Sequence, residues 1–314
     1  MIYSLSFLPT NCAIGTCILS CRLSLQNISK AQKTSFKNFV DMVLLLHQVS
    51  PLKNCRTIVD LKLDTCIIGF QVPESSCLRN LKLLHLSSIT FLDTDSFGTF
   101  FYACPLLQEL TVSTCKWPTP TDSDCHLCLS SRKLIHLTII SFKGRIEVDA
   151  PNLAYLEYCS RGLDVALSLK KSDCLVTACL KVPFTENSAL IQLAPALIKV
   201  IQYAKELQLL DGVGQYLTRA EDNQIRSFPN LVKFYIGRCS YDTWKFVTYW
   251  LTNLHRLETL IFKQGVVKSG SRKKEWHPML PFSSRVNVIE IHNFVGKVTE
   301  LVILKHFLGN AKVP

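Results

Sequence analysis

The cysteines and histidines are the residues whose types and spacing could do chemistry in this sequence. Among 14 cysteines, Cys125 and Cys128 form a Cys-x-x-Cys pair, with His126 between them. A structural zinc site normally needs two such pairs, and the sequence contains no second one. A redox pair belongs at a strand-to-helix junction, whereas Pro118 and Pro120 predict a loop before this pair. The sequence therefore predicts no metal site and no cofactor, and most cysteines are expected to be reduced and buried.

Motifs for enzymatic chemistry are missing as well. The sequence has no P-loop, no Gly-x-Gly-x-x-Gly, no Gly-x-Ser-x-Gly and no His-Glu-x-x-His. The histidines are scattered, and His126, His136, His277 and His292 have no carboxylate partner at a recognisable spacing. A nucleophilic Cys/His pair stays open, because such groups assemble in space rather than along the chain. We expect a protein that is not an enzyme.

The positive charge of the chain does not identify a nucleic-acid binder. The net charge is +11, and the densest basic cluster is Lys268, Arg272, Lys273 and Lys274. Stacking on bases would require aromatic residues between the basic ones, and this cluster has none. We interpret it as a solvated loop, so nucleic acid is not expected as a partner.

The first residues bear on the compartment. Residues 1–21 carry no charged side chain, but polar residues and Pro9 interrupt the run. It therefore lacks the basic start and continuous apolar stretch of a signal peptide, and it is too polar to span a membrane. With the many unpaired cysteines, this predicts no membrane association and a location in the nucleus or cytoplasm.

The elements that must position any site follow from a repeat. A unit of the form apolar-x-x-apolar-x-apolar recurs, and its middle residues lie 19 to 29 positions apart, the range of leucine-rich repeats. This repeat accounts for much of the excess of leucine, which occurs 47 times. The middle residues, called markers below, are Leu61, Leu84, Leu110, Leu137, Leu156, Ala178 (a degenerate copy), Leu207, Phe234, Leu260 and Ile289.

The repeat predicts the fold class. Its last two apolar residues lie on one face of a short strand, and stacked parallel strands then form a continuous apolar spine. Cys66, Cys115 and Cys239 occupy the strand exit, where these repeats use Asn or Cys. Helical spacing between strands, as at Phe97, Phe100, Phe101 and Cys104, predicts helices there and also within residues 36–44, 190–204 and 244–254. We predict an α/β fold, an irregular leucine-rich-repeat solenoid similar to the RNI-like horseshoe, with parallel strands on the concave face and helices on the convex face.

Several segments resemble one family. Residues 103–110, followed by Cys115, resemble the CPxLExLxLxxC repeat of plant F-box proteins with leucine-rich repeats. Residues 228–231, 276–278, 288–296 and 307–311 resemble the FBD region that follows those repeats. Residues 6–22 are similar to the second half of the family's F-box. The resemblance implies a partial F-box-like helical segment at 1–25, leucine-rich repeats at 26–227 and FBD-like repeats at 228–314, shortened at both ends relative to the family.

The resemblance also implies a role. An F-box docks on the Skp-type adaptor of a cullin ubiquitin ligase, and the repeats hold a protein substrate. The matching residues place adaptor binding at Leu8, Pro9, Thr10, Ala13, Leu19 and Arg22, although a helical cap over the first repeat is the alternative for them. Strand alternation places substrate binding on the concave face, at Lys62, His85, Thr111, Tyr235 and Glu290.

Two functions from different classes follow from these observations. The first is a substrate-recognition subunit, or a truncated relative of one, in a Skp-cullin-F-box ubiquitin ligase. The alternative is a leucine-rich-repeat interaction protein without ligase coupling. The substrate and any small-molecule co-ligand are not identified by the sequence.

Overall fold

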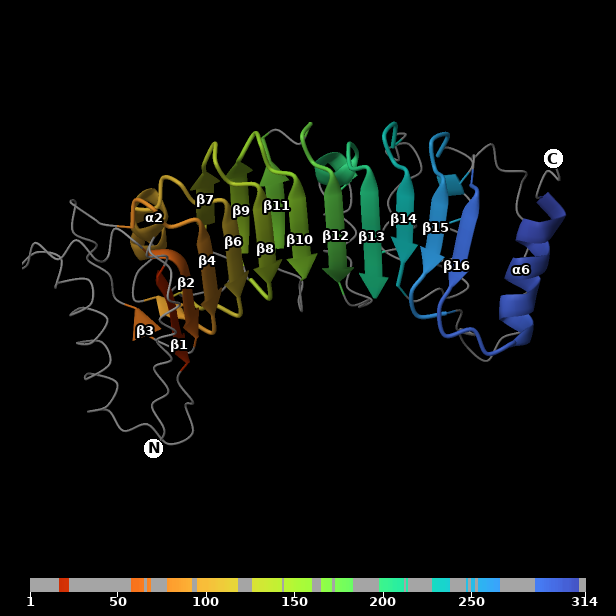
Figure 1. The fold of residues 1–314 in the computed structure, drawn as a ribbon, viewed down its shortest axis with the longest axis horizontal. Coiled ribbons are helices and arrows are strands. Elements are labelled where there is room, and N and C mark those ends of the chain that lie inside the picture. Colours follow the sequence, from red (N-terminus) through yellow and green to blue (C-terminus); the bar gives the residue numbers. More distant parts are fainter. Residues whose placement is uncertain are drawn as a thin grey trace, which may run out of the picture. The chain divides into compact units, whose positions relative to one another are not determined.

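The protein is described from a computed structural model, whose helices and strands are labelled in Figure 1. The chain divides into two compact units. Unit 1 comprises residues 1–153 and 164–171, and unit 2 comprises residues 154–163 and 172–314. The structure describes residues 17–22, 58–64, 67–68, 78–91, 95–117, 126–142, 144–159, 165–170, 173–182, 198–211, 213, 228–237, 247, 250–251, 254–265 and 286–310.

Unit 1 is built on a parallel sheet whose register follows the sequence repeat. Its strands, in spatial order, are β1 (Cys17–Arg22), β2 (Ile58–Asp64), β4 (Leu83–Ser87), β6 (Glu109–Ser113) and β8 (His136–Ile140). The marker Leu84 pairs with Leu61 on one side and with Leu110 on the other, and Leu110 pairs with Leu137. The predicted stacking of markers is confirmed.

The parallel strands of unit 2 pair according to the same rule. Its strands are β10 (Tyr155–Cys159), β12 (Thr177–Val182), β13 (Glu206–Asp211), β14 (Lys233–Ile236), β15 (Thr259–Phe262) and β16 (Val288–Ile291). The degenerate marker Ala178 pairs with Leu156 and with Leu207, so it belongs to the repeat as predicted. Phe234 and Leu260 pair in the same way and are both fully buried.

Helix is present in three of the predicted helical stretches. Helix α2 (Asp95–Tyr102) confirms the helix around Phe97, residues 198–201 are helical within 190–204, and residues 247, 250 and 251 are helical within 244–254. The predicted helix within residues 36–44 lies outside the described residues. Unit 1 also carries a second parallel sheet in the order β11 (Val165–Leu169), β9 (Gly144–Asp149) and β7 (His126–Ser130). Short strands β3 (Ile67–Ile68) and β5 (Thr90–Phe91) form another pair. The repeat pattern did not predict these additional strands.

The second sheet is explained by its own alternation. In β7, Leu127 and Leu129 are buried while the residues beside them are exposed, and in β9 Ile146 and Val148 are buried in the same way. This period of two is typical of a strand that is apolar on one face only. The apolar face is the one that contributes to the core of unit 1.

Aromatic side chains fill the space behind the main sheet of each unit. In unit 1, the Trp117 ring stacks on Phe91 at 4.9 Å between centroids and meets Phe142 edge-on at 5.0 Å. In unit 2, Trp250 packs against Phe228 at 4.4 Å. Offset and edge-on pairs at these distances add to the stabilisation from burial alone. These aromatic residues form core, not a cofactor pocket.

The same backbone geometry recurs at three strand ends in unit 1. Ser88, Thr114 and Ser141 each follow a strand and have positive φ angles of 54°, 51° and 53°. Cys115, which directly follows Thr114, is buried, and its thiol lies 3.8 Å from the carbonyl oxygen of Leu86. Burial raises the pKa of Cys115 to about 11, so it is a neutral packing residue. The structural role predicted for Cys115 is confirmed, whereas Cys66 and Cys239 lie outside the described residues.

The last helix of unit 2 begins at a buried carboxylate. Helix α6 (Val298–Asn310) has Glu300 in its first turn, and Glu300 is only 1% exposed. The backbone N–H groups of Val295 and Lys297 donate to its Oε2 at 3.0 and 2.9 Å. Burial opposes the charge, but these N–H groups and that of Gly296 outweigh it and hold the pKa of Glu300 below its usual range. The carboxylate fixes the turn that leads from β16 into the helix.

Gly265 shows how closely two strand exits approach each other in unit 2. It follows β15 with a φ of +68°, which favours glycine. A Cβ at this position would lie 3.3 Å from the carbonyl oxygen of His292 and 3.5 Å from Oε1 of Glu300. Glycine is therefore required here both by the backbone angle and by the contact with the start of α6.

The N-terminal expectation of helix is wrong where the structure describes it. Cys17–Arg22 is strand β1, and Leu19 pairs with the marker Leu61 while Arg22 pairs with Asp64. Leu19 thus occupies a marker position that the repeat search missed. The remainder of the predicted helical segment lies outside the described residues.

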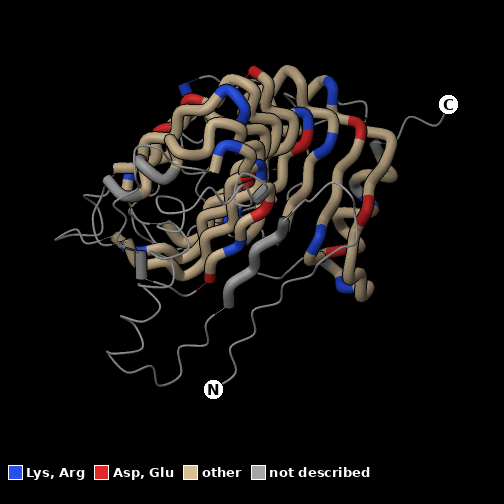
Figure 2. The backbone as a smooth tube through the Cα atoms, turned by 60° about the vertical axis from the view of Figure 1, so that its left-hand side comes forward, with Lys and Arg blue, Asp and Glu red and all other residues tan. Residues whose placement is uncertain are grey.

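Among the described residues, the basic side chains do not gather on one element. Figure 2 shows acidic and basic positions interspersed along the described backbone of each unit. The basic cluster from Lys268 to Lys274 lies outside the described residues. Within the described part of the chain, no helix is long and apolar enough to span a membrane.

Candidate functional site

The outward side chains of the unit 1 main sheet form a row that the sequence predicted. Lys62 pairs with His85, His85 pairs with Thr111, and Thr111 pairs with Thr138. Each of these residues lies between two spine residues, so its side chain points away from the core. We call these four residues the unit 1 outer row. The structure brings Lys62, His85 and Thr111 together on adjacent strands.

The corresponding row of unit 2 contains more kinds of functional group. Tyr235 pairs with Ile261, and Ile261 pairs with Glu290, so the two predicted residues are separated by one strand. The unit 2 outer row consists of Glu157, Cys179, Gln208, Tyr235, Ile261 and Glu290. It combines an aromatic ring, an amide and two carboxylates, the side chains that bind protein partners by stacking and hydrogen bonding.

Lys263 connects three strands of this row. Its Nζ donates to Oε1 of Gln208 at 2.7 Å and lies 4.9 Å from the centre of the Tyr235 ring. Its backbone N–H donates to the carbonyl oxygen of Ile236 at 2.8 Å, which fixes the start of the side chain. Sequence reasoning missed Lys263, although it lies two residues after Ile261 and therefore on the same face of the chain. The hydrogen bond and the ring contact preorganise the centre of the unit 2 outer row.

Burial and a neighbouring negative charge raise the pKa of two side chains at the other end of this row, Tyr155 and Cys179. The Tyr155 hydroxyl donates to Oε2 of Glu157 at 3.1 Å. Burial first, and then the charge and hydrogen bond of Glu157, raise the pKa of Tyr155 to about 12. Burial and the Glu157 charge also raise the pKa of Cys179 to about 11, although Lys263 opposes them. Cys179 is 6% exposed, and at neutral pH it is a thiol with little nucleophilic character.

Ion pairs border the two outer rows. In unit 1, Nδ1 of His136 lies 3.1 Å from Oε1 of Glu109, and in unit 2, Nε2 of His292 lies 3.0 Å from Oε2 of Glu290. The expectation that these histidines lack a carboxylate partner is therefore wrong. The pairs join residues two apart on one strand or directly opposite on adjacent strands. Both partners are about half exposed, so such pairs contribute little to stability and stay accessible to a ligand.

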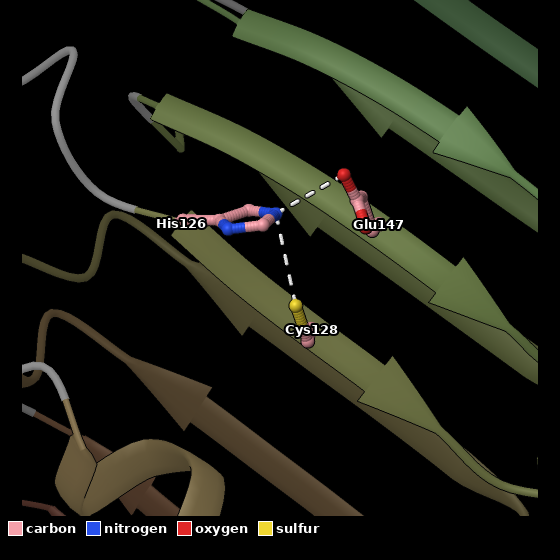
Figure 3. A group of neighbouring side chains, drawn as sticks. All are labelled: His126, Cys128 and Glu147. Carbon is pink, nitrogen blue, oxygen red and sulfur yellow. Dashed lines mark hydrogen bonds and ion pairs between the residues drawn. The ribbon is translucent and has the colours of Figure 1, made fainter.

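A separate group of ligand atoms lies on the second sheet of unit 1. Nε2 of His126 is 3.3 Å from Oε1 of Glu147 and 3.7 Å from Sγ of Cys128 (Figure 3). Sequence reasoning considered Cys128 only with Cys125, which lies outside the described residues. It missed Glu147, because the pairing of β7 with β9 is not visible in the spacing along the chain. These three residues could hold a metal ion.

The same group does not form a nucleophilic triad. A triad uses one ring nitrogen of histidine for the nucleophile and the other for the orienting carboxylate. Here the single atom Nε2 of His126 faces both Cys128 and Glu147. A proton that His126 took from the thiol would occupy the nitrogen that also contacts the carboxylate. The geometry therefore does not support relay catalysis by these residues.

The predicted adaptor residues are described only in part. Leu19 and Arg22 lie in β1, at the edge of the unit 1 main sheet. Leu8, Pro9, Thr10 and Ala13 lie outside the described residues. Adaptor binding at these six positions stays a prediction.

Comparison with known proteins identifies the family. The family model described as "At1g61320/AtMIF1, LRR domain" matches residues 15–278, most of the chain and both units. The chain belongs to this leucine-rich-repeat family. The match begins before β1, which agrees with the marker position of Leu19 in the ladder. The predicted fold class is thereby confirmed.

Curated relatives of the leucine-rich-repeat protein come from Arabidopsis thaliana. The putative F-box/LRR-repeat protein At3g58880 is 27% identical over 80% of this chain and 60% of its own length. The putative F-box/LRR-repeat protein At3g58920 is 28% identical, covering 83% and 64%. F-box protein At3g59150 is 30% identical, covering 81% and 60%. The chain thus spans about 60% of the length of these relatives, and no solved structure matches it.

These comparisons confirm the resemblance to plant F-box/leucine-rich-repeat proteins. None of them tests the FBD-like assignment of residues 228–314, which stays a prediction. The family match ends at residue 278, while the structure continues the parallel ladder through Ile289 in β16. The repeat architecture therefore extends beyond the matched region.

Proposed function

We propose that this leucine-rich-repeat protein recognises a protein substrate for a Skp-cullin-F-box ubiquitin ligase. The observation that carries the proposal is the unit 2 outer row, in which Lys263 holds Gln208 and Tyr235 in a preformed polar and aromatic surface. Names of the relatives as F-box proteins support the connection to the ligase. The partners of this function are a Skp-type adaptor and a protein substrate, in the nucleus or cytoplasm.

In the proposed mechanism this chain itself makes and breaks no covalent bond. Holding a substrate on the outer rows raises its effective concentration near the ubiquitin-charged enzyme, which increases the rate of transfer without a catalytic group. The buried thiols of Cys115 and Cys179 fit this role, because burial raises their pKa and keeps them protonated. We infer that the protein is not an enzyme.

Two measurements test the proposal together. The full chain is mixed with purified Skp adaptor and cullin to measure complex formation, and cellular proteins whose half-life shortens when the chain is expressed are identified. Tyr235→Ala should abolish the shortening for the true substrate, while Lys305→Ala, an exposed position on α6, serves as the matched control. No adaptor binding by a folded chain would refute ligase coupling. Equal substrate loss with Tyr235→Ala would refute the assigned surface.

The alternative is a repeat protein that binds a partner without ligase coupling. One observation favours it, because Cys17–Arg22 pairs with β2 as a strand of the repeat and is not helical. In this case the chain binds its partner and competes with longer relatives for it. The two functions separate cleanly, since the alternative expects Tyr235-dependent partner binding without any shortening of the partner's half-life.

A further inference from the structure

We propose that His126, Cys128 and Glu147 form a binding site for a single divalent cation of borderline softness, with Zn²⁺ as the best fit. His126 and Cys128 are two residues apart on β7, so their side chains lie on the same face of the second sheet. Glu147 on β9 is the direct register partner of Cys128. The pairing of two neighbouring strands therefore brings three different donor atoms to one place (Figure 3).

The distances between the donors agree with tetrahedral coordination. With Zn–N and Zn–O bonds of about 2.0 Å and a Zn–S bond of about 2.3 Å, tetrahedral angles place nitrogen and oxygen about 3.3 Å apart and nitrogen and sulfur about 3.5 Å apart. The separations in unit 1 are 3.3 Å between His126 and Glu147 and 3.7 Å between His126 and Cys128. All three donors lie within 4.8 Å of one another. Small side-chain rotations on the exposed face close the remaining distance.

The convergence on one nitrogen also favours a cation. Because Nε2 of His126 faces both Sγ and Oε1, one of the two contacts cannot be a hydrogen bond donated by a neutral ring. A cation among the three atoms satisfies all of them at once. Nδ1 then remains available for a second hydrogen bond, as is usual for metal-bound histidine.

Charge and ligand type select the ion. A thiolate, a carboxylate and a neutral imidazole carry two negative charges, which a divalent ion neutralises. Mixed sulfur, nitrogen and oxygen donors suit Zn²⁺ and exclude Ca²⁺ and Mg²⁺, which prefer oxygen alone. Three protein ligands leave the fourth position to water, as in open zinc sites. The main opposing charge is Arg145, the exposed register partner of His126.

This site is independent of the proposed function. The cation ligands lie on the second sheet of unit 1, whereas none of the strands of the outer rows belongs to that sheet. Loss of the metal site would leave Tyr235-dependent partner binding intact, and loss of partner binding would leave the metal site intact.

The experiment uses the full chain with the metal ion alone. Reduced protein is titrated with Zn²⁺ against a chromophoric chelator and, separately, with Co²⁺, whose visible absorption reports tetrahedral geometry with a thiolate ligand. Cys128→Ser and His126→Asn are compared with matched controls at exposed positions outside the cluster, Cys174→Ser and His255→Asn. Circular dichroism confirms that each variant folds, as expected for exposed side chains.

We expect one strong Zn²⁺ equivalent per chain, with a thiolate band for Co²⁺. Cys128→Ser and His126→Asn should each weaken binding by at least about 100-fold, more than the loss of an outer-shell partner costs. Arg145→Gln should strengthen binding, and both controls should leave it unchanged. The proposal is overturned if no strong equivalent binds, or if Cys128→Ser binds Zn²⁺ as tightly as the natural sequence does.

Discussion

Replacement of Lys263 by methionine tests whether the unit 2 outer row is preorganised. The ammonium group joins Gln208 on β13 and the Tyr235 ring on β14 to the end of β15 through contacts of 2.7 and 4.9 Å. Methionine keeps most of the apolar stem of lysine but removes the charge and the donors. The substitution therefore removes these two interactions with little change in packing.

The expected cost follows from the two contacts. A charge-assisted hydrogen bond between half-buried groups contributes about 1 kcal/mol. A cation over an aromatic face at a partly exposed site adds about 0.5 to 1 kcal/mol. Lys263→Met should therefore lower the free energy of unfolding by about 1.5 to 2 kcal/mol, of which about 1 kcal/mol should be coupled to Gln208.

Urea unfolding with a double-mutant cycle measures this coupling. Lys263→Met, Gln208→Met and the double variant are compared at equal m-values, so that a change in midpoint reports stability alone. Lys305→Met on α6 is the matched control, and we expect a change within about 0.5 kcal/mol for this exposed lysine. The reasoning is refuted if the effects of Lys263→Met and Gln208→Met simply add within about 0.3 kcal/mol.

Four further predictions follow from the described contacts. Leu110→Ala should cost about 3 kcal/mol in the free energy of unfolding, because the marker is fully buried, while Thr111→Ala on the outer row should stay within about 0.5 kcal/mol. Gly265→Ala should cost at least about 1 kcal/mol in the same assay, because of its positive φ and close neighbours. The lowered pKa of Glu300 means that its stabilisation is present above the pKa of an unfolded glutamate and is lost as pH falls through the folded pKa, so Glu300→Gln should flatten the acid limb of the stability curve. Difference absorbance titration against Tyr155→Phe should place ionisation of Tyr155 at about pH 12, and Glu157→Gln should lower it; stability from this group is present below the unfolded pKa and declines as pH rises toward 12.

The fold could be predicted because one periodic signal determines both burial and register. Leu84, Leu110 and Leu137 are markers in the sequence and direct partners in the ladder. The same signal recovered Ala178, although alanine is a weak apolar residue, because its spacing fits between Leu156 and Leu207. Strand alternation then identified the outward positions, including Tyr235.

The sequence was less informative about strands that lie outside the recognised repeats. Residues 126–130 alternate between buried and exposed positions, a strand pattern, yet the prolines before them led us to expect a loop in this region. Leu19 was assigned to a helical module by resemblance, although it pairs with Leu61. Contacts between distant residues, such as Lys263 with Gln208 and His126 with Glu147, depend on which strands are neighbours. No spacing along the chain shows them before the ladder is known.

The two outer rows share a backbone but differ in what they can contribute to recognition. The unit 1 outer row presents Lys62, His85 and two threonines. Lys62 contacts Asp60 at 3.5 Å but is more than half exposed, so its long side chain still loses rotamer entropy when a partner orders it. In the unit 2 outer row, Lys263 already holds Tyr235 and Gln208, so part of that cost is met before binding. Tyrosine is also enriched among residues that dominate binding energy. We therefore expect affinity for a substrate to concentrate on unit 2, with substitutions in the unit 1 outer row changing specificity more than strength.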